Sequence, residues 1–366
     1  MHTIRRLSNV ATPSEPLDVR RIEFGRIFTP NLFRMEYREG SWQDPRIESL
    51  RSFDLHPAAI VFHYGQAIFE GLKAFRHADG KIVLFRPEMN ADRLNRSAGR
   101  LDMPAIDAGF FLEAASALVD HESSFVPPAP GSLYLRPTMI GIEPCIGVKS
   151  ANEFLFYILA LPAGSYFKEV IDNAGSIRVL ISESSTRAAR GGTGNVKAAG
   201  NYAASLKITS LAKSLGCAQV LFLDAVERSY VEEMGGMNIF FVKNDTLITP
   251  SLSDTILAGI TRDTILHLAR DFGIPVQEEP VHIGDVISGI QSGTITEALA
   301  CGTAASVTGI GAFQFEDGHA ISVGYTCPGP LTNMLFDRIR SIQFGEFPDD
   351  HRWLFQVRAL EAVEKP

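Results

Sequence analysis

The chain has 366 residues, of which 45% are hydrophobic and 21% are charged, and its formal net charge at pH 7 is -8. A chain of this length has room for two domains of about 100–200 residues each, and its composition predicts a soluble globular protein with a full hydrophobic core. The acidic balance and the lack of a lysine- or arginine-rich block argue against nucleic acid as a partner.

The cysteines and the N-terminus indicate the compartment. Cys145, Cys217, Cys301 and Cys327 are far apart and form no CxxC pair, and the nine histidines form no HExxH motif, so we expect neither a disulfide framework nor a metal site. The first 18 residues lack the apolar core of a secretory signal, and the apolar run at 154–162 is well short of the roughly 20 residues of a membrane span. We expect a cytoplasmic protein without membrane partners.

The first half of the chain predicts short strands and helices. A strand at 81–86 follows a turn signal at 78–80, and helical spacing predicts helices at 88–101 and 110–119. The second helix ends before the PPAPG run at 127–131. Strands are predicted at 132–136 and 153–161, the latter apolar throughout, as expected of a strand buried on both faces.

A polar stretch at 163–176 with glycine near each end predicts an interdomain loop. It divides a small N-terminal α/β domain (1–162) from a larger C-terminal α/β domain (177–366). In the second domain we predict strands at 177–182, 219–223 and 238–243. Helices are predicted at 201–215, closed by Gly216, and at 260–272, closed by Gly273 and Pro275. The predicted fold class is mixed α/β in two domains.

Lys197 lies in the segment GGTGNVKAAGNYAASL (191–206), between a glycine-rich loop and the predicted helix. A lysine amine with a pKa of about 10.4 is a poor nucleophile at neutral pH, but it can form a Schiff base with a carbonyl cofactor. The segment alone is equally compatible with an ordinary loop lysine.

Two glycine-containing turns predict anion sites. The segment ILAGITR (256–262) opens a predicted helix, where free backbone N–H groups and the helix dipole attract an anion, with Gly259 and Thr261 placed to help. The segment ACGTAA (300–305) has a similar composition. Together the turns could share one phosphate, or bind a phosphate and a carboxylate, and each alone is also typical of a plain tight turn.

Glu232 and Glu233 lie side by side in VEEMGGMN (231–238), before a predicted strand, so we expect at least one carboxylate to point inward. A buried carboxylate requires a cationic or protonated group opposite it. A ring nitrogen about 4 Å away would be attracted by roughly 4 kcal/mol at an effective dielectric near 20, which would raise its pKa by about 3. The alternative is a surface pair that caps a turn.

Aromatic residues gather in FHYGQAIFEG (62–71), and Tyr134 and Arg136 lie in LYLRPT (133–138). Tyrosine offers an apolar wall with a polar tip, and arginine matches a carboxylate. Aromatic residues in such a pattern are also common in a protein core.

Together these segments resemble the branched-chain amino acid aminotransferases, a fold-type IV (class IV aminotransferase) family of pyridoxal-phosphate enzymes. The matching stretches occur in the family's order between 24 and 345 and are FGRIFTPNL, FHYGQAIFEGLKAF, LFRPEMNADRL, LYLRPTMIG, GGTGNVKAAGNYAASL, EEMGGMN, ILAGITR and CGTAA. The resemblance implies two domains with the active site between them and a loop at 163–176 that matches the family's interdomain loop.

The resemblance also implies roles for individual residues. Lys197 would hold pyridoxal 5'-phosphate as a Schiff base and then act as acid and base in the 1,3-proton shift. Tyr202 would bind the phenolic oxygen of the cofactor, and Glu233 would face its ring nitrogen. The phosphate would be bound by Arg93, Leu257, Gly259, Ile260, Thr261 and Thr303.

For the substrate, the resemblance implies that Ala304, Tyr134 and Arg136 meet the α-carboxylate. Tyr64 and Phe69 would wall the side-chain pocket, partly across a homodimer interface, and Phe28 would add to it. Gly236 departs from members that have a threonine there. Some animal members have a CxxC redox pair. In this chain residues 303–306, which follow Cys301, contain no cysteine, so we expect no thiol switch of that kind.

The predicted function is the reversible, ping-pong transfer of an amino group from L-leucine, L-isoleucine or L-valine to 2-oxoglutarate. Alternatives within the fold are a D-amino acid transaminase, an aminodeoxychorismate lyase or a specialised biosynthetic transaminase. LYLRPT and FHYGQAIFEG favour the L-branched substrates. A non-catalytic binding protein on this scaffold would be expected to lose Lys197 or Glu233, and both are present.

Overall fold

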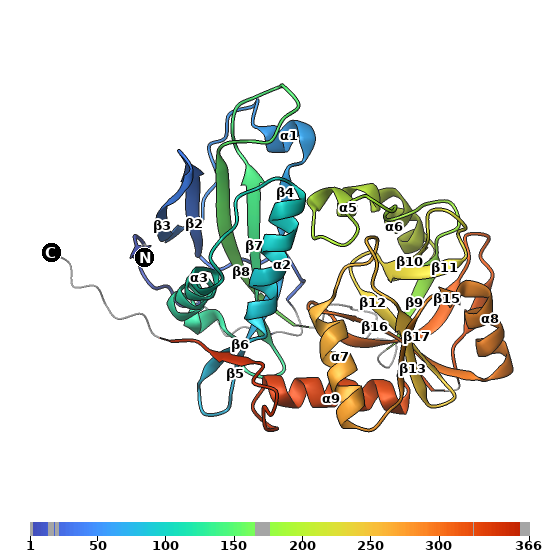
Figure 1. Cartoon of the computed structure of the whole chain (residues 1–366). Coiled ribbons are helices and arrows are strands. Elements are labelled where there is room, and N and C mark those ends of the chain that lie inside the picture. Colours follow the sequence, from blue (N-terminus) through green and yellow to red (C-terminus); the bar gives the residue numbers. More distant parts are fainter. Residues whose placement is uncertain (1–2, 14–17, 19–21, 165–175, 325, 359–366) are drawn as a thin grey trace. The chain divides into compact units, whose positions relative to one another are not determined.

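The computed structural model describes residues 3–13, 18, 22–164, 176–324 and 326–358. The chain forms two compact units, each with its own sheet (Figure 1). Unit 1 comprises Met1–Tyr166 and Ser341–Pro366, and unit 2 comprises Phe167–Arg340. The predicted interdomain loop lies almost wholly at 165–175, outside the described residues.

Unit 1 is built on a nine-stranded sheet with the order β1-β3-β2-β8-β7-β5-β6-β19, in which β4 also pairs with β7. β7 and β8 form its long central ladder, antiparallel from Ser132↔Ala163 to Gly141↔Phe154. The strands are β1 (Arg5–Arg6), β2 (Asn31–Arg38), β3 (Ser41–Ser49), β4 (Ala67–Phe69), β5 (Leu72–Arg76), β6 (Ile82–Phe85), β7 (Ser132–Gly141), β8 (Phe154–Ala163) and β19 (Leu354–Gln356).

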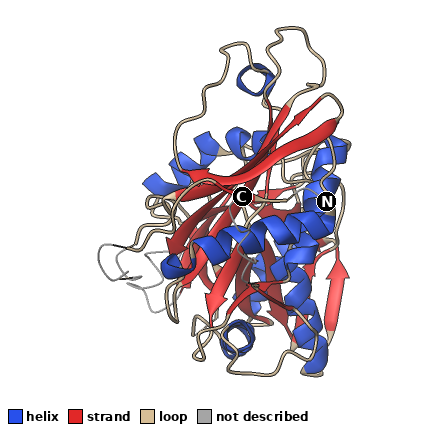
Figure 2. Cartoon of the chain, turned by 90° about the vertical axis from the view of Figure 1, so that its left-hand side faces the viewer, coloured by secondary structure: helices blue, strands red, loops and turns tan. Residues whose placement is uncertain are grey.

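Helices α2 and α3 cover one face of this sheet (Figure 1). Figure 2 shows the helices and strands of the chain in separate colours. Pro87 opens α2 and the Asp107 side chain caps α3 by accepting a hydrogen bond from Phe110 N (2.9 Å), which supplies the expected start signals of the two helices. Phe33, Phe111 and Phe156 are fully buried between helices and sheet. The helices are α1 (Ile60–Tyr64), α2 (Pro87–Arg100), α3 (Ala108–His121) and the 3-10 turn η1 (Ser123–Phe125).

β7 runs past the point where its predicted strand ended. The predicted strand ended at Arg136, and the next residue is a proline, which lacks the N–H that a strand pairs with. Pro137 is accommodated because the strand on that side is interrupted between Phe69, which ends β4, and Leu72, which starts β5. The interruption places Glu70 and Gly71 beside the middle of β7.

Unit 2 is built on a ten-stranded mixed sheet with the order β14-β13-β12-β16-β17-β9-β10-β11-β15, in which β18 also pairs with β17. The strands are β9 (Ser176–Ile181), β10 (Gln219–Leu223), β11 (Tyr230–Met234), β12 (Asn238–Lys243), β13 (Thr246–Pro250), β14 (Val276–Glu279), β15 (Val281–His282), β16 (Ile295–Gly302), β17 (Ser306–Gln314) and β18 (Ala320–Ser322).

The helices of unit 2 correct one prediction. The helix expected at 201–215 is two helices that meet at Ser205, whose hydroxyl donates to Tyr202 O (2.9 Å) and so competes with helical pairing. The helix expected at 260–272 is α7, and Gly273 follows it with a positive φ of 70°. The helices are α5 (Ala199–Ala204), α6 (Leu206–Ser214), α7 (Ile260–Asp271), α8 (Ile283–Ser292) and α9 (Pro330–Gln343).

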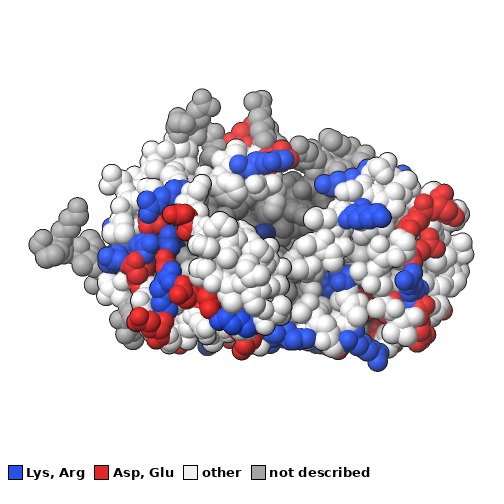
Figure 3. All heavy atoms as spheres, turned by 90° about the horizontal axis from the view of Figure 1, so that it is seen from above, with Lys and Arg blue, Asp and Glu red and all other residues white. Residues whose placement is uncertain are grey.

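The surface mixes charges of both signs. On the face seen in Figure 3, lysine and arginine side chains are interspersed with aspartate and glutamate. Among the described residues, no helix combines the length and apolar character needed to cross a membrane, and no group of three or more histidine, cysteine, aspartate or glutamate side chains is arranged to hold a metal ion.

Candidate active site

Lys197 lies at the end of the glycine-rich loop, just before α5. Its Nζ donates a hydrogen bond to the hydroxyl of Tyr202 (2.9 Å) and lies 5.4 Å from the centre of that ring. The lysine side chain is partly buried rather than extended into solvent. The amine is therefore held by a phenol at a defined position, as a reacting group requires.

The loop before Lys197 is fastened by Asn201. The Asn201 side-chain amide donates to Thr193 O (2.7 Å) and Val196 O (3.0 Å), and its carbonyl accepts from the Thr193 hydroxyl (2.6 Å). These contacts satisfy backbone groups that an irregular loop would otherwise leave unpaired. Asn201 follows Lys197 by four residues in the sequence, but no spacing rule predicts that it fastens the loop.

Glu233 is buried and surrounded by donors. Its carboxylate accepts from Leu257 N (2.8 Å) and from Asn238 Nδ2 (3.3 Å), and it pairs with Arg187 Nη2 (2.9 Å). The expected cation opposite a buried carboxylate is thus present within the protein itself. Arg187 also donates to Gly194 O (3.1 Å) and Thr255 O (2.9 Å), so one guanidinium joins three segments.

A β-bulge explains why both adjacent glutamates are buried. Leu221 and Leu223 on β10 pair with Met234 and Val231 on β11, so a two-residue step faces a three-residue step. Such an extra residue breaks the regular alternation of side chains along the strand. Glu232 is 7% exposed and Glu233 is 2% exposed. A surface pair capping a turn, the alternative left open above, is therefore wrong.

Asn238 connects the two predicted anion turns. It pairs with Cys301 at the end of β16, and its amide also donates to Leu257 O (3.0 Å). Gly259, the residue before α7, lies so close that a Cβ there would be 1.9 Å from Asn238 Oδ1. Leu257 and Gly259 thus lie just before a twelve-residue helix that begins with Ile260 and Thr261, and Thr303 and Ala304 lie in the turn between β16 and β17.

In unit 1, Arg93 projects from α2 into a buried ion pair. Its Nε donates to Glu70 Oε1 (2.7 Å) and its Nη2 to Glu70 Oε2 (2.8 Å). Asn90 adds a further hydrogen bond to the same carboxylate (2.7 Å), which is fully buried. A two-point contact of this kind fixes the plane of the guanidinium.

Tyr134 and Arg136 lie on the same side of β7 and touch. Arg136 Nη2 donates to the Tyr134 hydroxyl (3.0 Å), and the guanidinium carbon lies 4.6 Å from the centre of the Phe69 ring. Arg136 Nε is buried and has no hydrogen-bond partner among the described residues. A Cβ on Gly71 would lie 2.1 Å from the Tyr134 hydroxyl, so the glycine makes room for that side chain.

The remaining predicted substrate residues are more exposed. Tyr64 is 42% exposed and its hydroxyl donates to the backbone oxygen of Ile146. Phe28 is 41% exposed. Phe62, Ile146 and Val148 are exposed by 60%, 60% and 86%. The backbone pairing of Ala59 with Pro144 brings these segments together, so Phe62, Ile146 and Val148, which we call the exposed apolar patch, lie on neighbouring segments.

The sequence departs from some family members at Cys301 and Gly236, and the structure shows what surrounds each of them. Cys301 is 1% exposed, and burial raises the pKa of its thiol, which makes the thiolate scarce. A Cβ on Gly236 would lie 3.8 Å from a ring carbon of Tyr202, so this glycine borders the tyrosine that binds Lys197.

Comparison with known proteins identifies the family of the chain. Residues 67–313 match the family described as amino-transferase class IV. The chain belongs to this family.

Two relatives match over almost the whole chain. A branched-chain-amino-acid transaminase of Bacillus subtilis is 44% identical over 94% of this chain and 96% of its own. A branched-chain-amino-acid aminotransferase of Mycolicibacterium smegmatis is 44% identical over 91% of this chain and 92% of its own.

Solved structures show the same fold. The branched-chain amino acid aminotransferase of Escherichia coli superposes with a TM-score of 0.72 at 28% identity, covering 88% of this chain and 99% of that one. The holo form of the Thermobaculum terrenum enzyme, which contains pyridoxal phosphate, superposes with a TM-score of 0.71 at 26% identity, covering 90% of this chain and 100% of that one.

The protein is a fold-type IV aminotransferase that depends on pyridoxal 5'-phosphate. Its own residues fit that cofactor: unit 2 offers an amine held by a phenol, a buried carboxylate and the N–H groups that open α7, and unit 1 offers a buried arginine. When bound, the cofactor supplies an electron sink for the bond broken at the substrate Cα.

Proposed function

We propose that this chain catalyses the reversible transfer of the amino group of L-leucine, L-isoleucine or L-valine to 2-oxoglutarate. The observation that supports this proposal most directly concerns Arg136. Its buried Nε has no hydrogen-bond partner among the described residues, and its guanidinium lies over Phe69. An arginine donor set against an aromatic wall suits a molecule with a carboxylate and an apolar side chain. The identity to two branched-chain aminotransferases supports the same substrates.

The residues of unit 2 carry the proton transfers in this proposal. Lys197 would hold the cofactor covalently until the substrate amine takes its place, and its freed Nζ would then take the proton from the substrate Cα. Tyr202 orients that nitrogen through the 2.9 Å hydrogen bond and binds the phenolic oxygen of the cofactor. Glu233 keeps a proton on the ring nitrogen, because its fixed negative charge favours the protonated ring.

The phosphate is bound in this proposal by Arg93 and by the turn at the start of α7, formed by Leu257, Gly259, Ile260 and Thr261, with Thr303. A helix N-terminus and a buried guanidinium are both suited to a phosphate. Tyr134, Arg136 and Ala304 receive the α-carboxylate, and Tyr64, Phe69 and Phe28 line the side-chain pocket.

We also propose that the chain acts as a homodimer in the cytoplasm. The exposed apolar patch at Phe62, Ile146 and Val148 supports an interface at this part of unit 1, since an apolar patch on a surface often marks a contact. Light scattering should give twice the chain mass. A single-chain mass in both the loaded and the cofactor-free protein would contradict the dimer.

The cofactor lysine can be tested against a competing amine. Lys73 is a good control because desolvation lowers its pKa to about 8, which also makes it a reactive amine. Borohydride reduction of the loaded protein, followed by peptide mass spectrometry, should place the pyridoxyl group on Lys197. Lys197→Ala should abolish the label and the visible absorbance, and Lys73→Ala should keep both. A label on Lys73 would overturn the assignment.

Substrate class is tested by single-turnover reactions of the loaded protein. L-leucine, L-isoleucine and L-valine should bleach the visible band fast, and D-alanine should bleach it slowly. The band should return with 2-oxoglutarate. Fast bleaching by D-alanine but not by L-leucine would favour a D-amino acid transaminase.

A further inference from the structure

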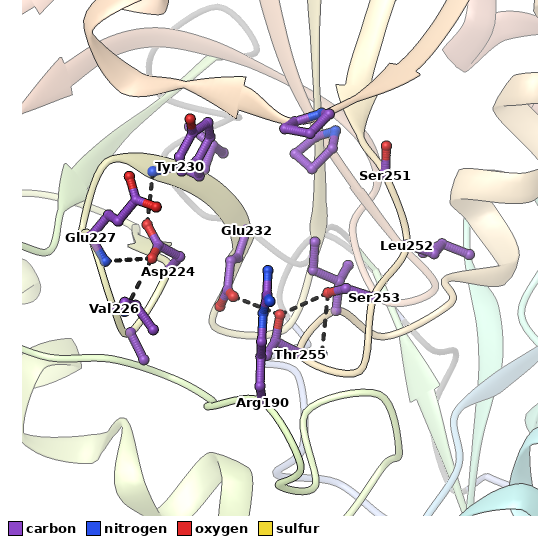
Figure 4. Close-up of a pocket in the computed structure, with 15 residues that line it drawn as sticks. Arg190, Asp224, Val226, Glu227, Tyr230, Glu232, Ser251, Leu252, Ser253 and Thr255 are labelled. Atoms are coloured by element: carbon purple, nitrogen blue, oxygen red, sulfur yellow. Dashed lines mark hydrogen bonds between the residues drawn. The ribbon is translucent and has the colours of Figure 1, made fainter.

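A second pocket of unit 2 takes no part in the proposed reaction. It has a volume of about 400 Å3 and lies among the β10–β11 turn, β11, the loop after β13 and the glycine-rich loop (Figure 4). This size is within the usual range for a small-molecule site. The pocket is lined by Arg190, Asp224, Ala225, Val226, Glu227, Tyr230, Val231, Glu232, Pro250, Ser251, Leu252, Ser253, Thr255, Ile256 and Pro280.

Glu232 is the buried polar group of this pocket. One carboxylate oxygen, Oε1, accepts a hydrogen bond from the Thr255 hydroxyl (2.6 Å). The other, Oε2, is buried without a hydrogen-bond partner among the described residues. Burial raises the pKa of Glu232 to about 7, against the opposing effects of Thr255 and Arg187. An unpartnered buried carboxylate oxygen is costly, and a cationic donor would relieve that cost.

The other carboxylate close to the floor is already satisfied. Both oxygens of Asp224 accept backbone N–H groups, those of Val226, Glu227, Ser229 and Tyr230. Although burial alone would raise the pKa of Asp224, these hydrogen bonds lower it to about 2. Asp224 therefore shapes the β10–β11 turn. The third lining carboxylate, Glu227, is exposed, so Glu232 is the one with a buried oxygen that can accept from a ligand.

Arg190 is the one lysine or arginine among the residues that line the pocket. It is exposed, and Figure 4 shows its side chain extending from the loop toward the end of the Glu232 side chain. A guanidinium beside a pocket is suited to a carboxylate. The pocket therefore offers an acceptor for a cation and a donor for an anion.

Apolar residues make up part of the lining around these two groups, beside polar residues such as Tyr230, Ser251 and Ser253. Val226, Leu252 and Ile256 contribute hydrocarbon groups to the lining, and Pro250 and Pro280 add two rings. A few charged groups among apolar walls are typical of sites that orient a small ligand. A molecule that satisfies all three features carries an ammonium group, a carboxylate and an apolar side chain.

We propose that this pocket binds a free amino acid with an apolar side chain, whose ammonium group donates to Glu232 Oε2 and whose carboxylate accepts from Arg190. The ligand is bound intact and no bond is made or broken. The pocket adjoins the proposed cofactor site along the chain. Its lining residues Thr255 and Ile256 immediately precede Leu257, whose N–H donates to Glu233.

The test is calorimetric titration of the loaded, borohydride-reduced protein, which cannot turn over. L-leucine should bind in a component that Leu252→Trp removes, and in that component 3-methylbutylamine, which lacks the carboxylate, and 4-methylpentanoate, which lacks the ammonium group, should each bind at least about tenfold more weakly. Equal binding of 3-methylbutylamine would show that no carboxylate is recognised and would overturn the proposal.

Variants locate the binding site. Glu232→Gln should weaken L-leucine binding by about tenfold or more, and Leu252→Trp should abolish it by filling the pocket. Leu252 is 47% exposed, so the second variant should fold even if the first does not. Glu183→Gln, an exposed carboxylate of the same unit outside the pocket lining, is the matched control and should bind as the original protein does. Unchanged binding in Leu252→Trp would place L-leucine elsewhere and refute the pocket.

Discussion

Arg187 Nη2 lies 2.9 Å from Glu233 Oε1, and both side chains are only 3% exposed. Glu233 is the carboxylate that we propose for the ring nitrogen of the cofactor. The same guanidinium binds backbone oxygens of the Lys197 loop and of the loop before α7. Arg187 is thus a positioning residue, because it stabilises the ionised form of Glu233 and holds the two loops beside it.

Arg187→Lys should retain the positive charge but lose some of the hydrogen bonds by which Arg187 joins Glu233, the Lys197 loop and the loop before α7. We expect cofactor affinity to fall by about tenfold, measured by fluorescence titration of the cofactor-free protein. Arg187→Leu should cost about 3–5 kcal/mol of stability, because it leaves a buried carboxylate without its cation. Arg178→Lys is the control, since this arginine is exposed and contacts Gln314 instead. Unchanged affinity in Arg187→Lys would contradict the positioning role.

Glu70→Gln should loosen Arg93 by removing the charge that orients its guanidinium. Loss of a charge-assisted contact predicts roughly ten- to hundredfold weaker binding of pyridoxal 5'-phosphate. Pyridoxal, which lacks the phosphate, supplies the internal control, because its binding should change little. If both ligands lose affinity equally, Glu70 supports the fold of unit 1 rather than phosphate binding.

Gly71→Ala should displace Tyr134, because the added Cβ would lie 2.1 Å from its hydroxyl oxygen. The Tyr134–Arg136 hydrogen bond would be lost with it, so we expect KM for L-leucine to rise by roughly tenfold while cofactor affinity stays the same. Gly99→Ala on α2 is the matched substitution, since a Cβ there meets nothing within 4 Å. It should keep KM and increase stability by up to about 1 kcal/mol. A normal KM in Gly71→Ala would separate Tyr134 from substrate binding.

Glu122→Gln should change how stability depends on pH. Glu122 is fully buried, and burial raises its pKa from 4.5 to about 7, although Asn31 donates to it. Between these values the unfolded chain releases a proton that the folded protein keeps, so the stability of the original protein falls as pH rises from about 5 to 7.

The glutamine variant lacks this loss. The unfolding free energy of Glu122→Gln relative to that of the original protein should therefore increase by about 2–3 kcal/mol between about pH 5 and 8, measured by urea denaturation. Glu113→Gln, a partly exposed carboxylate on α3, should show no such trend. A pH-independent difference for Glu122→Gln would refute an elevated pKa.

Local patterns were sufficient for many elements. The strands predicted at 219–223 and 238–243 are β10 and β12, and the helix at 260–272 differs from α7 by one residue. Prediction was weaker where a side chain or a neighbour decides the outcome. Ser205 interrupts a helical pattern through its own hydroxyl, and Pro137 stays in a strand because of a gap in the strand beside it.

The candidate site divides in the same way. Lys197 and Tyr202 are five residues apart, and their contact follows from a loop that runs directly into a helix. The partners of more distant groups could not be inferred, because Arg187–Glu233 and Glu70–Arg93 depend on how separate segments pack. Glu70 stood in a segment singled out for its aromatic residues, and charge complementarity with Arg93 was the available signal.

Because of the bulge in β11, the number of residues in this short strand is important. Val231 and Met234 are both anchored by pairing to β10, with Glu232 and Glu233 between them. Deleting either glutamate would restore regular pairing without moving the two anchors, and a single carboxylate would then have to serve either Arg187 or Thr255. Length at this point is therefore as constrained as residue identity, and homologues one residue shorter here would need a different solution for one of the two contacts.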